Sequence, residues 1–360
     1  MKHSILLVLL TCGLVSTVHA GPFTSGTPEY ASLGALSFGP DNVLFIGDSQ
    51  KGQILALQVA DETATDGELE VQDIDVKIAA LIGTHARDVQ INDMAVNPVS
   101  GNAYLTVARG NADILLKVAP GDKIEHVALE NVNYATKSLA SVVAEDKKDR
   151  RGRSLRREAI TDLVFTNGEL YIAGLSNEEF SSTLRIVAYP FDASERATSV
   201  EIFHAAHNRY ETHAPIRTLM AYDLAQVPHV LAAYTCTPLV TFPVEELVDG
   251  AHVKGKTVAE LGSGNRPLDM IAYGQDGKDF ILLANSNRTL MKIDPADIEA
   301  TKEGITTPVE GRYETAGVEY IAIAQVGVQQ IDNLNDEHVL VLQRMGNGSL
   351  NLRSLQKRRL

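Results

Sequence analysis

The sequence predicts an all-β protein, a six-bladed β-propeller of four-stranded blades whose ring is closed by a strand near the N-terminus. Three observations lead to this prediction. A pattern of two apolar runs separated by a turn recurs six times, at about the length of one propeller blade. A further apolar run follows most copies, which gives four strands per repeat. The runs are rich in β-branched and aromatic residues, and none keeps a long helical period.

Each copy of the repeat corresponds to one blade. The copies are Leu36–Val59, Ile91–Val118, Ile160–Phe191, Ile216–Val244, Pro267–Ile293 and Val328–Leu355. In the first copy, Gly39-Pro40-Asp41-Asn42 separates two runs and is a strong turn signal, because proline fixes φ and the Asp and Asn side chains bond back to the backbone. Fourth strands are expected at Val76–Leu81, Ile124–Leu129, Val200–Phe203, Val258–Leu261 and Tyr320–Ala324.

The two ends of the propeller are expected to meet. The sixth copy has no fourth strand, because the chain ends shortly after it. The segment Thr27–Leu33 precedes the first copy and has no other place in the pattern. We therefore expect it to close the ring by pairing with Ser349–Leu355, which would remove two exposed sheet edges.

The first residues resemble a secretory signal peptide. Lys2 precedes the apolar run Ile5–Val18, and Val18-His19-Ala20 is a small-residue cleavage site before Gly21. The run is too short for a transmembrane span. Lipidation at Cys12 is the alternative, and Thr11 disfavours it. The expected product is a periplasmic or secreted single domain of residues 21–360, after a signal peptide at 1–20.

Charge limits the classes of partner. The chain carries a formal net charge of -14, which argues against nucleic acid and anionic membrane surfaces. No other segment is apolar enough to span a membrane, and we expect a monomer. Residues 131–158 are interpreted as a long inserted loop, with a basic run at Lys147–Arg157. This run is expected to be a mobile, solvated loop, with a basic docking arm or a processing site as the alternative.

One position recurs at the start of each predicted inner strand. It is occupied by Ala35, Asp93, Asp162, Thr218, Asp269 and Gln330. The three carboxylates at this position could hold a hard divalent cation such as Ca²⁺ through oxygen ligands. Alternatively, each aspartate accepts hydrogen bonds from neighbouring backbone amides and ties adjacent blades together, which the usual pairing of buried polar groups favours.

Arginines are predicted to gather at one mouth of the channel. Loops that enter the inner strands, and loops between second and third strands, open on the same face of a propeller. They carry Arg87, Arg109, Arg209, Arg217, Arg266 and Arg288. Arginine forks suit carboxylate or phosphate groups, so Arg209, Arg217, Arg266 and Arg288, with His213, are the candidate ligand-binding residues. The alternative is that each arginine pairs with Glu178, Glu179 or Glu211.

Histidine and cysteine give weaker signals. His207 and His213 are six residues apart, which is not a usual zinc spacing, and Cys236 is distant in sequence. Cys236 is expected to be a buried, unreactive side chain. The alternative is a thiol nucleophile whose pKa is lowered by cationic neighbours.

The repeats resemble the six-bladed propeller class that includes NHL-repeat and gluconolactonase-like proteins. Phe38–Asp48 looks like the FGPDG-x-L-Y/F-V-x-D blade of that class, and the whole chain is similar to exported bacterial propellers. Gluconolactonase-like members bind a divalent cation in the channel through Glu, Asn and Asp. The resemblance therefore implies Asp93, Asp162, Asp269 and Asn285 as metal ligands, although no glutamate begins an inner strand.

The function expected from the sequence is binding. We expect an exported ligand-binding or protein-interaction module that needs no cofactor, with a small polar or anionic ligand or another exported protein as its partner. The alternative is a cation-dependent lactone or ester hydrolase, in which the cation polarises a carbonyl and His213 moves a proton.

The cleavage site gives a first prediction. Exported protein should begin at Gly21, because Val18-His19-Ala20 fits the signal peptidase pattern. Intact-mass analysis of protein recovered from the periplasm or medium measures this start. A mass that corresponds to a diacylglyceryl-modified Cys12 would contradict the prediction.

Overall fold

The computed structural model describes residues 23–360, apart from 66, 111, 237 and 312. The predicted signal peptide at 1–20, Cys12 and the predicted new N-terminus at Gly21 lie outside the described residues.

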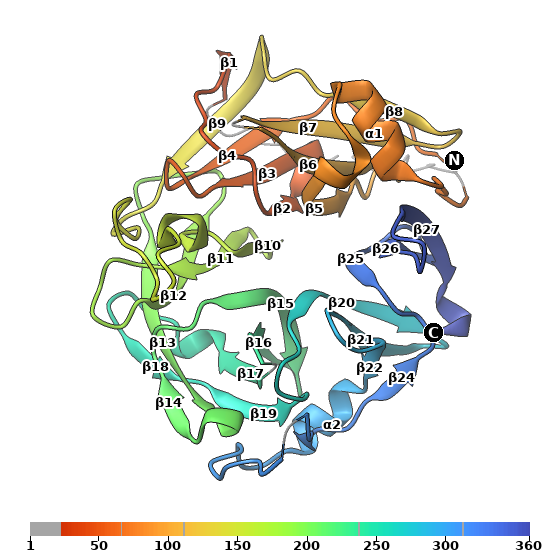
Figure 1. Cartoon of the computed structure of the whole chain (residues 1–360). Helices are drawn as coiled ribbons and strands as arrows, with labels where there is room; N and C mark the ends of the chain where they lie inside the picture. The colour runs from red at the N-terminus through yellow and green to blue at the C-terminus, as the bar shows by residue number, and fades with distance from the viewer. Residues whose placement is uncertain (1–22, 66, 111, 237, 312) are drawn as a thin grey trace, which may run out of the picture.

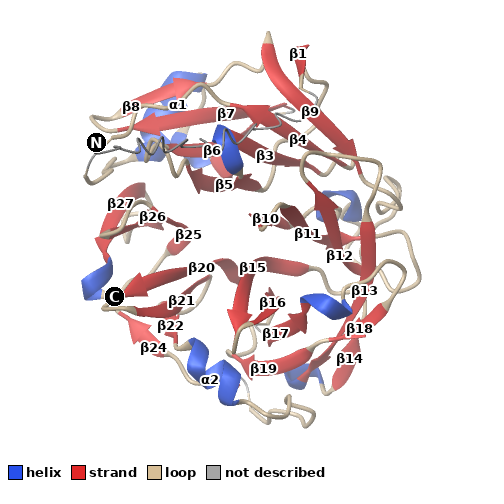
Figure 2. Cartoon of the chain, turned by 180° about the vertical axis from the view of Figure 1, so that it is seen from behind, coloured by secondary structure: helices blue, strands red, loops and turns tan. Residues whose placement is uncertain are grey.

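The described residues form a ring of six small antiparallel sheets around a common centre (Figures 1 and 2). This confirms the all-β class and the six-bladed propeller. We number the blades by the order of their inner strands in the chain. Blades 2 and 5 have four strands, blade 6 has three, and blades 1, 3 and 4 carry additional strands.

The first three blades take most of their strands from the first half of the chain. Blade 1 contains β1 (Thr24–Gly26), β2 (Leu36–Phe38), β3 (Val43–Asp48), β4 (Gln53–Gln58) and β9 (Val132–Ser138). Blade 2 contains β5 (Gln90–Val96), β6 (Ala103–Arg109), β7 (Ala112–Ala119) and β8 (Lys123–His126). Blade 3 contains β10 (Asp162–Thr166), β11 (Glu169–Leu175), β12 (Ser182–Ala188), β13 (Arg196–His204), β14 (Arg209–Glu211) and β18 (His252–Lys254).

The second half of the chain forms the other three blades. Blade 4 contains β15 (Ile216–Leu224), β16 (Val227–Tyr234), β17 (Pro238–Pro243), β19 (Lys256–Glu260) and β23 (Ala316–Gly317). Blade 5 contains β20 (Pro267–Gln275), β21 (Lys278–Asn285), β22 (Leu290–Ile293) and β24 (Ile321–Ile323). Blade 6 contains β25 (Val328–Asn333), β26 (His338–Arg344) and β27 (Leu350–Gln356).

The blades do not follow one another around the ring in chain order. The inner strand β2 contacts β5 on one side and β10 on the other, while β5 also contacts β25. Blade 1 therefore lies between blades 2 and 3, and the ring runs 2, 1, 3, 4, 5, 6. In Figure 1, blades 1 and 2 lie side by side at the top, next to blades 3 and 6 respectively.

Blade 1 is completed by a strand from later in the chain. The fourth strand beside β4 is β9, and β1 pairs with the outer side of β9. The stretch interpreted as a long loop at 131–158 therefore begins with a blade strand. Its second half is not in a strand, and it ends in the 3-10 turn η3 (Leu155–Glu158).

The predicted ring closure is wrong. Thr27–Leu33 contains no strand, and the β1 strand before it belongs to blade 1. The segment that follows β4 lies against β27 of blade 6 instead. Val71 and Leu352 exchange two backbone hydrogen bonds of 2.9 Å each, and Leu69 N–H donates to Ser354 Oγ at 2.7 Å. Sequence order could not reveal this pairing, because about 280 residues separate the two segments.

The predicted fourth strand at Val76–Leu81 is also wrong, because this segment is the helix α1 (Ile74–Ile82). Ile74, Ile78 and Ile82 are four residues apart, so they lie on one face of the helix and are buried between blades 2 and 6. Val76 is 52% exposed. Gly83 ends the helix with φ +71, and its N–H donates to the Ala79 carbonyl.

Short helices connect the remaining strands. They are α2 (Pro295–Ala300) and the 3-10 turns η1 (Pro40–Asn42), η2 (Ala86–Asp88), η4 (Ala205–His207), η5 (Val244–Glu246) and η6 (Lys357–Arg359). Among the described residues, no helix is long and apolar enough to cross a membrane.

The hydrophobic core is divided among the interfaces between blades. A separate buried cluster fills each interface, and each cluster contains side chains from two neighbouring blades. Between blades 1 and 3, for example, Phe45 stacks on Phe165 with ring centroids 5.4 Å apart. The position of each blade is therefore set by packing against its neighbours.

The helix α1 gives a test of this arrangement. Replacing Ile74 with Ala should lower the free energy of unfolding by about 2–5 kcal/mol, because it removes a fully buried side chain from the interface between blades 2 and 6. Urea unfolding followed by circular dichroism measures the change.

Val76→Ala on the same helix is the matched control, with an expected effect within about 0.5 kcal/mol. In a strand, residues 74 and 76 would share one face. Similar losses in both variants would therefore contradict the helix.

Candidate functional site

Four of the six inner strands begin with a shared irregularity. A β-bulge precedes the recurring position in four blades. The positions after the bulge are Asp93, Thr218, Asp269 and Gln330. The ring order places Asp93, Asp162 and Asp269 on alternate blades, namely 2, 3 and 5 with one other blade between each pair.

Each of these aspartates connects two blades. One carboxylate oxygen accepts the N–H of the next residue in its own strand at 2.8 Å. The other accepts an N–H from the neighbouring inner strand at 2.7 Å. The donors are Leu36 for Asp93, Leu219 for Asp162 and Ile331 for Asp269. Two interpretations of these aspartates follow from the sequence, as cation ligands or as acceptors that tie adjacent blades together. The structure contains the blade-to-blade hydrogen bonds of the latter.

Blade 6 uses other side chains for the same purpose. Asp332 accepts the N–H of Val96 in blade 2 at 2.7 Å. Gln330, with its amide nitrogen turned toward the carboxylates, donates to Asp93 Oδ1 and Asp269 Oδ2 at 2.9 Å each. Gln330 thus bridges two aspartates that would otherwise repel each other.

Crowding of carboxyl groups changes their acidity. Burial raises the pKa of Asp162 and that of Asp332 to about 6. Burial, reinforced by the charge of Asp162, raises the pKa of Asp93 well above its ordinary value. Burial and the charge of Asp93 do the same for the pKa of Asp269. These four carboxyl groups are nevertheless only partly buried from solvent.

A cation would have to use the oxygen lone pairs that these amides leave free. Asn285, the fourth predicted ligand, is buried, donates to the Leu283 carbonyl and accepts from Asn265. Calcium binding by Asp93, Asp162, Asp269 and Asn285 stays a prediction.

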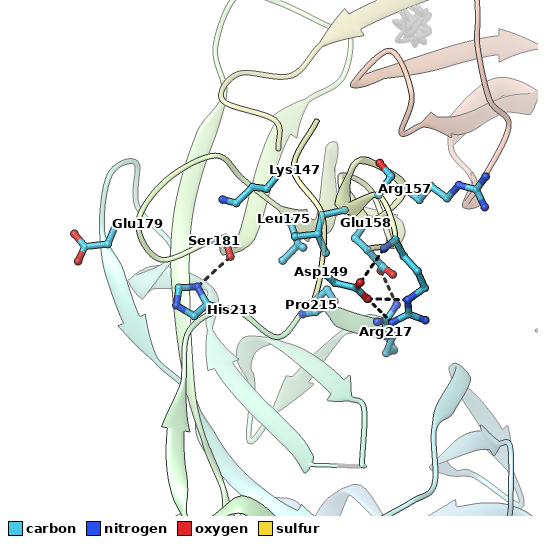
Figure 3. Close-up of a pocket in the computed structure, with 13 residues that line it drawn as sticks. Lys147, Asp149, Arg157, Glu158, Leu175, Glu179, Ser181, His213, Pro215 and Arg217 are labelled. Atoms are coloured by element: carbon cyan, nitrogen blue, oxygen red, sulfur yellow. Dashed lines mark hydrogen bonds and ion pairs between the residues drawn. The ribbon is translucent and has the colours of Figure 1, made fainter. Parts of the chain in front are cut away.

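A pocket of about 760 Å³ lies on the face where the inner strands begin, between blades 3 and 4 (Figure 3). One wall is the basic segment after β9, and the other is formed by loops of the two blades. The lining residues include Lys147, Asp149, Arg153, Arg157, Glu158, Glu179, Ser181, His213 and Arg217. The segment expected to be a mobile loop is thus part of a concave surface.

Two ion pairs lie among the residues that line this pocket. Arg217 Nη1 lies 2.6 Å from Glu158 Oε2, and Arg217 Nε donates to Thr235 Oγ1 at 3.1 Å. Arg153 pairs with Asp149 at 2.6 Å. His213 Nδ1 lies 3.2 Å from Ser181 Oγ on the opposite side, as Figure 3 shows.

The other predicted arginines do not line this pocket. Arg209 pairs with Glu211 at 2.9 Å. Arg288 donates to the Tyr313 carbonyl at 2.5 Å, and Arg266 is exposed beside blade 5. Of the five candidate ligand-binding residues, the structure brings only Arg217 and His213 into one cavity.

A second polar cluster surrounds Cys236, in the turn between β16 and β17. Cys236 is partly exposed rather than buried, which corrects the expectation from the sequence. His204 at the end of β13 and His207 in η4 lie beside it, with their ring centroids 3.8 Å apart. Glu211 Oε2 lies 2.9 Å from His204 Nδ1, and Glu211 Oε1 lies 2.8 Å from His207 Nδ1.

Hydrogen bonds within this cluster shift the pKa values of its members. Hydrogen bonding with His204 lowers the pKa of Cys236, against the effect of burial. Burial opposes the charged form of His204, but hydrogen bonds with Cys236 and Glu211 outweigh it and raise the pKa of His204 to about 9. For Glu211, hydrogen bonds from the two histidines outweigh burial and lower its pKa to about 2.

Sequence reasoning missed His204, and Glu211 as its partner. It named the basic run Lys147–Arg157 but did not place it in a pocket. The spacing His204-x-x-His207-x-x-x-Glu211 was the available signal for the first group. No sequence signal connected this group of residues to Cys236, because the contact with Cys236 forms between two blades.

Comparisons with known proteins add little. No protein-family model matches the sequence, and no curated protein matches it. The chain is similar to the structure of Drosophila Semaphorin 1b extracellular domains 1-2, with a TM-score of 0.39, 9% identity, and coverage of 93% of this chain and 87% of that one.

Two other structures give similar values. A chain of the mitotic checkpoint complex has a TM-score of 0.39 at 8% identity, over 98% of this chain and 99% of that one. Kuenenia stuttgartiensis hydrazine synthase has a TM-score of 0.37 at 10% identity, over 92% and 78%. The pairing of strands in this chain, and not these similarities, establishes its fold.

The raised pKa of Asp162 predicts a pH dependence. An acid whose pKa is about 6 when folded and 3.8 when unfolded favours folding most below pH 4, and loses this contribution as the pH rises through 6. The free energy of unfolding of the wild type, relative to that of Asp162→Asn, should therefore fall as the pH rises from 4 to 7, by roughly 3 kcal/mol at most.

Urea unfolding followed by circular dichroism at a series of pH values measures this difference. Asp146→Asn, which removes an exposed carboxylate, is the control. A difference between wild type and Asp162→Asn that does not change with pH would contradict the assignment.

Proposed function

We propose that this protein is an exported binding module, and that the pocket between blades 3 and 4 holds a small polar or anionic ligand. The observation that carries the proposal is the charge of the pocket. Four arginine or lysine side chains line it beside three carboxylates, in a chain whose net charge is -14. Two of these carboxylates, Asp149 and Glu158, already pair with arginines.

Lys147 and Arg157 are the cations best suited to bind a ligand. Both line the pocket and are exposed, and neither takes part in the ion pairs found among the described residues. In Figure 3, the guanidinium of Arg157 extends away from His213 and Ser181. His213 and Ser181 offer further polar atoms on the opposite wall. A carboxylate or phosphate group between the walls could therefore bond to both sides.

Arg217 contributes differently from the sequence-based expectation. Its contacts with Glu158 and Thr235 support the wall and leave less of the guanidinium for a ligand. We propose that Arg217 positions the wall, and that Arg209, Arg266 and Arg288 act outside this pocket. A protein partner that presents an acidic side chain would meet the same groups.

The hydrolase alternative remains a proposal of lower rank. His213 would have to move a proton near a cation held by the central aspartates. In the structure, His213 lines the pocket and bonds to Ser181. No described contact connects it to Asp93, Asp162 or Asp269.

The pocket gives a direct binding test. Citrate and inorganic phosphate should raise the melting temperature of the protein, and choline should not. For the bound anion, Arg157→Ala and Lys147→Ala should each weaken binding roughly 10- to 100-fold, as expected for loss of a charged hydrogen bond. Isothermal titration calorimetry measures the affinity.

Lys302→Ala is the matched control, because Lys302 follows α2 and does not line the pocket. Equal effects of the Lys302 and Arg157 substitutions would show a nonspecific charge effect. Failure of both anions to bind would contradict this ligand class for the pocket.

A further inference from the structure

The cluster around Cys236 is separate from the proposed ligand pocket. Among the residues that the structure describes, His204, His207 and Cys236 are the one group of three potential metal ligands whose ligand atoms all lie within 4.8 Å of one another. They come from the end of β13, from η4 and from the turn after β16. Two blades therefore contribute to one set of two nitrogens and one sulfur.

The orientation of the two histidines is fixed by a single carboxylate. Glu211 contacts Nδ1 of both rings, at 2.9 Å for His204 and 2.8 Å for His207. Arg209 Nε donates to the same carboxylate at 2.9 Å. When each Nδ1–H donates to Glu211, each Nε2 keeps a lone pair. A carboxylate that orients an imidazole in this way is the usual outer partner of a metal-binding histidine.

One buried polar atom beside the cluster has no hydrogen-bond partner among the described residues. It is Oε2 of Glu260, a side chain that is 1% exposed and whose Oε1 accepts the Ala205 N–H at 2.7 Å. His204 is also only 1% exposed, and its ring bonds with Glu211 and Cys236. Buried polar atoms normally find partners, so Oε2 of Glu260 indicates a missing one.

We propose that His204, His207 and Cys236 bind one zinc ion, with Glu211 orienting both histidines. Zinc takes nitrogen and sulfur ligands together, and three protein ligands leave a fourth position for water or a substrate. The charge of Glu260 acts on both His204 and Cys236, so this carboxylate lies near the cluster. Tetrahedral zinc places such ligand atoms about 3.4–3.6 Å apart, so a contraction of roughly 1 Å closes the site.

An ion can reach this site from one side. The side chain of His207 is 42% exposed and Cys236 is partly exposed, whereas His204 and Glu260 form the buried back of the cluster. Exchange of zinc with chelators in solution therefore does not require unfolding.

A thiol nucleophile is the competing interpretation of the same residues. Such a site needs backbone or side-chain donors for the developing oxyanion. The amide of Cys236 is already used, because it donates to the Asn265 carbonyl at 3.0 Å. A nucleophile also needs only one imidazole. The second histidine, with its nitrogen held by the same carboxylate, favours a metal.

The test uses the full chain with Cys12→Ser, so that Cys236 is the only thiol. Protein stripped with a chelator is titrated with Zn²⁺ against a chromophoric chelator, and with Co²⁺ as a spectroscopic substitute. We expect one ion per chain and a thiolate-to-cobalt charge-transfer band. Cys236→Ser should abolish the band, and Glu211→Gln should lower zinc affinity about 10- to 100-fold.

His229→Gln is the matched control, because His229 lies in blade 4 and bonds to the Val227 carbonyl. It should leave zinc affinity unchanged. A melting curve for each variant shows that it folds. Absence of stoichiometric binding, or binding that Cys236→Ser leaves intact, would overturn the proposal.

A second measurement needs no substitution at the site. Bound Zn²⁺ should protect Cys236 from alkylation by iodoacetamide at neutral pH. Rapid alkylation that Zn²⁺ does not slow would also overturn the metal site, and would favour the nucleophile.

Discussion

The structure depends on carboxylates that cross from one blade to the next at the centre of the ring. Asp93, Asp162 and Asp269 each accept one N–H from their own strand and one from a neighbouring blade. Hydrogen bonds to charged groups contribute about 1.5–3 kcal/mol each, more than neutral ones. Burial opposes this gain and raises the pKa values of these groups. The amide of Gln330 between Asp93 and Asp269 reduces the remaining repulsion without adding a charge.

The path of the chain makes the ring depend on contacts that are distant in sequence. Blade 1 receives β9 after blade 2 is complete, and blade 6 receives residues 69–73 from the start of the chain. Outer-strand positions are thus filled across blade boundaries, so removing one segment would affect two blades. In a propeller where only one blade combines strands from the two ends of the chain, contacts distant in sequence would be confined to that blade.

The sequence predicted what is local and missed what is not. The repeat located the inner strands and the recurring aspartates, because a turn, an apolar run and a bulge are set by neighbouring residues. It misread Ile74–Ile82, where the four-residue spacing of isoleucines was the stronger signal. It could not place Val71 on Leu352 or His204 beside Cys236, because these contacts depend on which blades become neighbours. The signal peptide lies outside the described residues and stays a prediction.

Arg217 connects the two candidate sites. Its guanidinium bonds to Glu158 in the pocket wall and to Thr235, the residue before Cys236. The wall of the pocket and the turn that carries the thiol are therefore supported by the same side chain. Both sites lie on the face where inner strands begin, where loops from adjacent blades converge. Rigid strands hold these loops at their ends, so polar groups from different blades can be brought together without disturbing the apolar interfaces below.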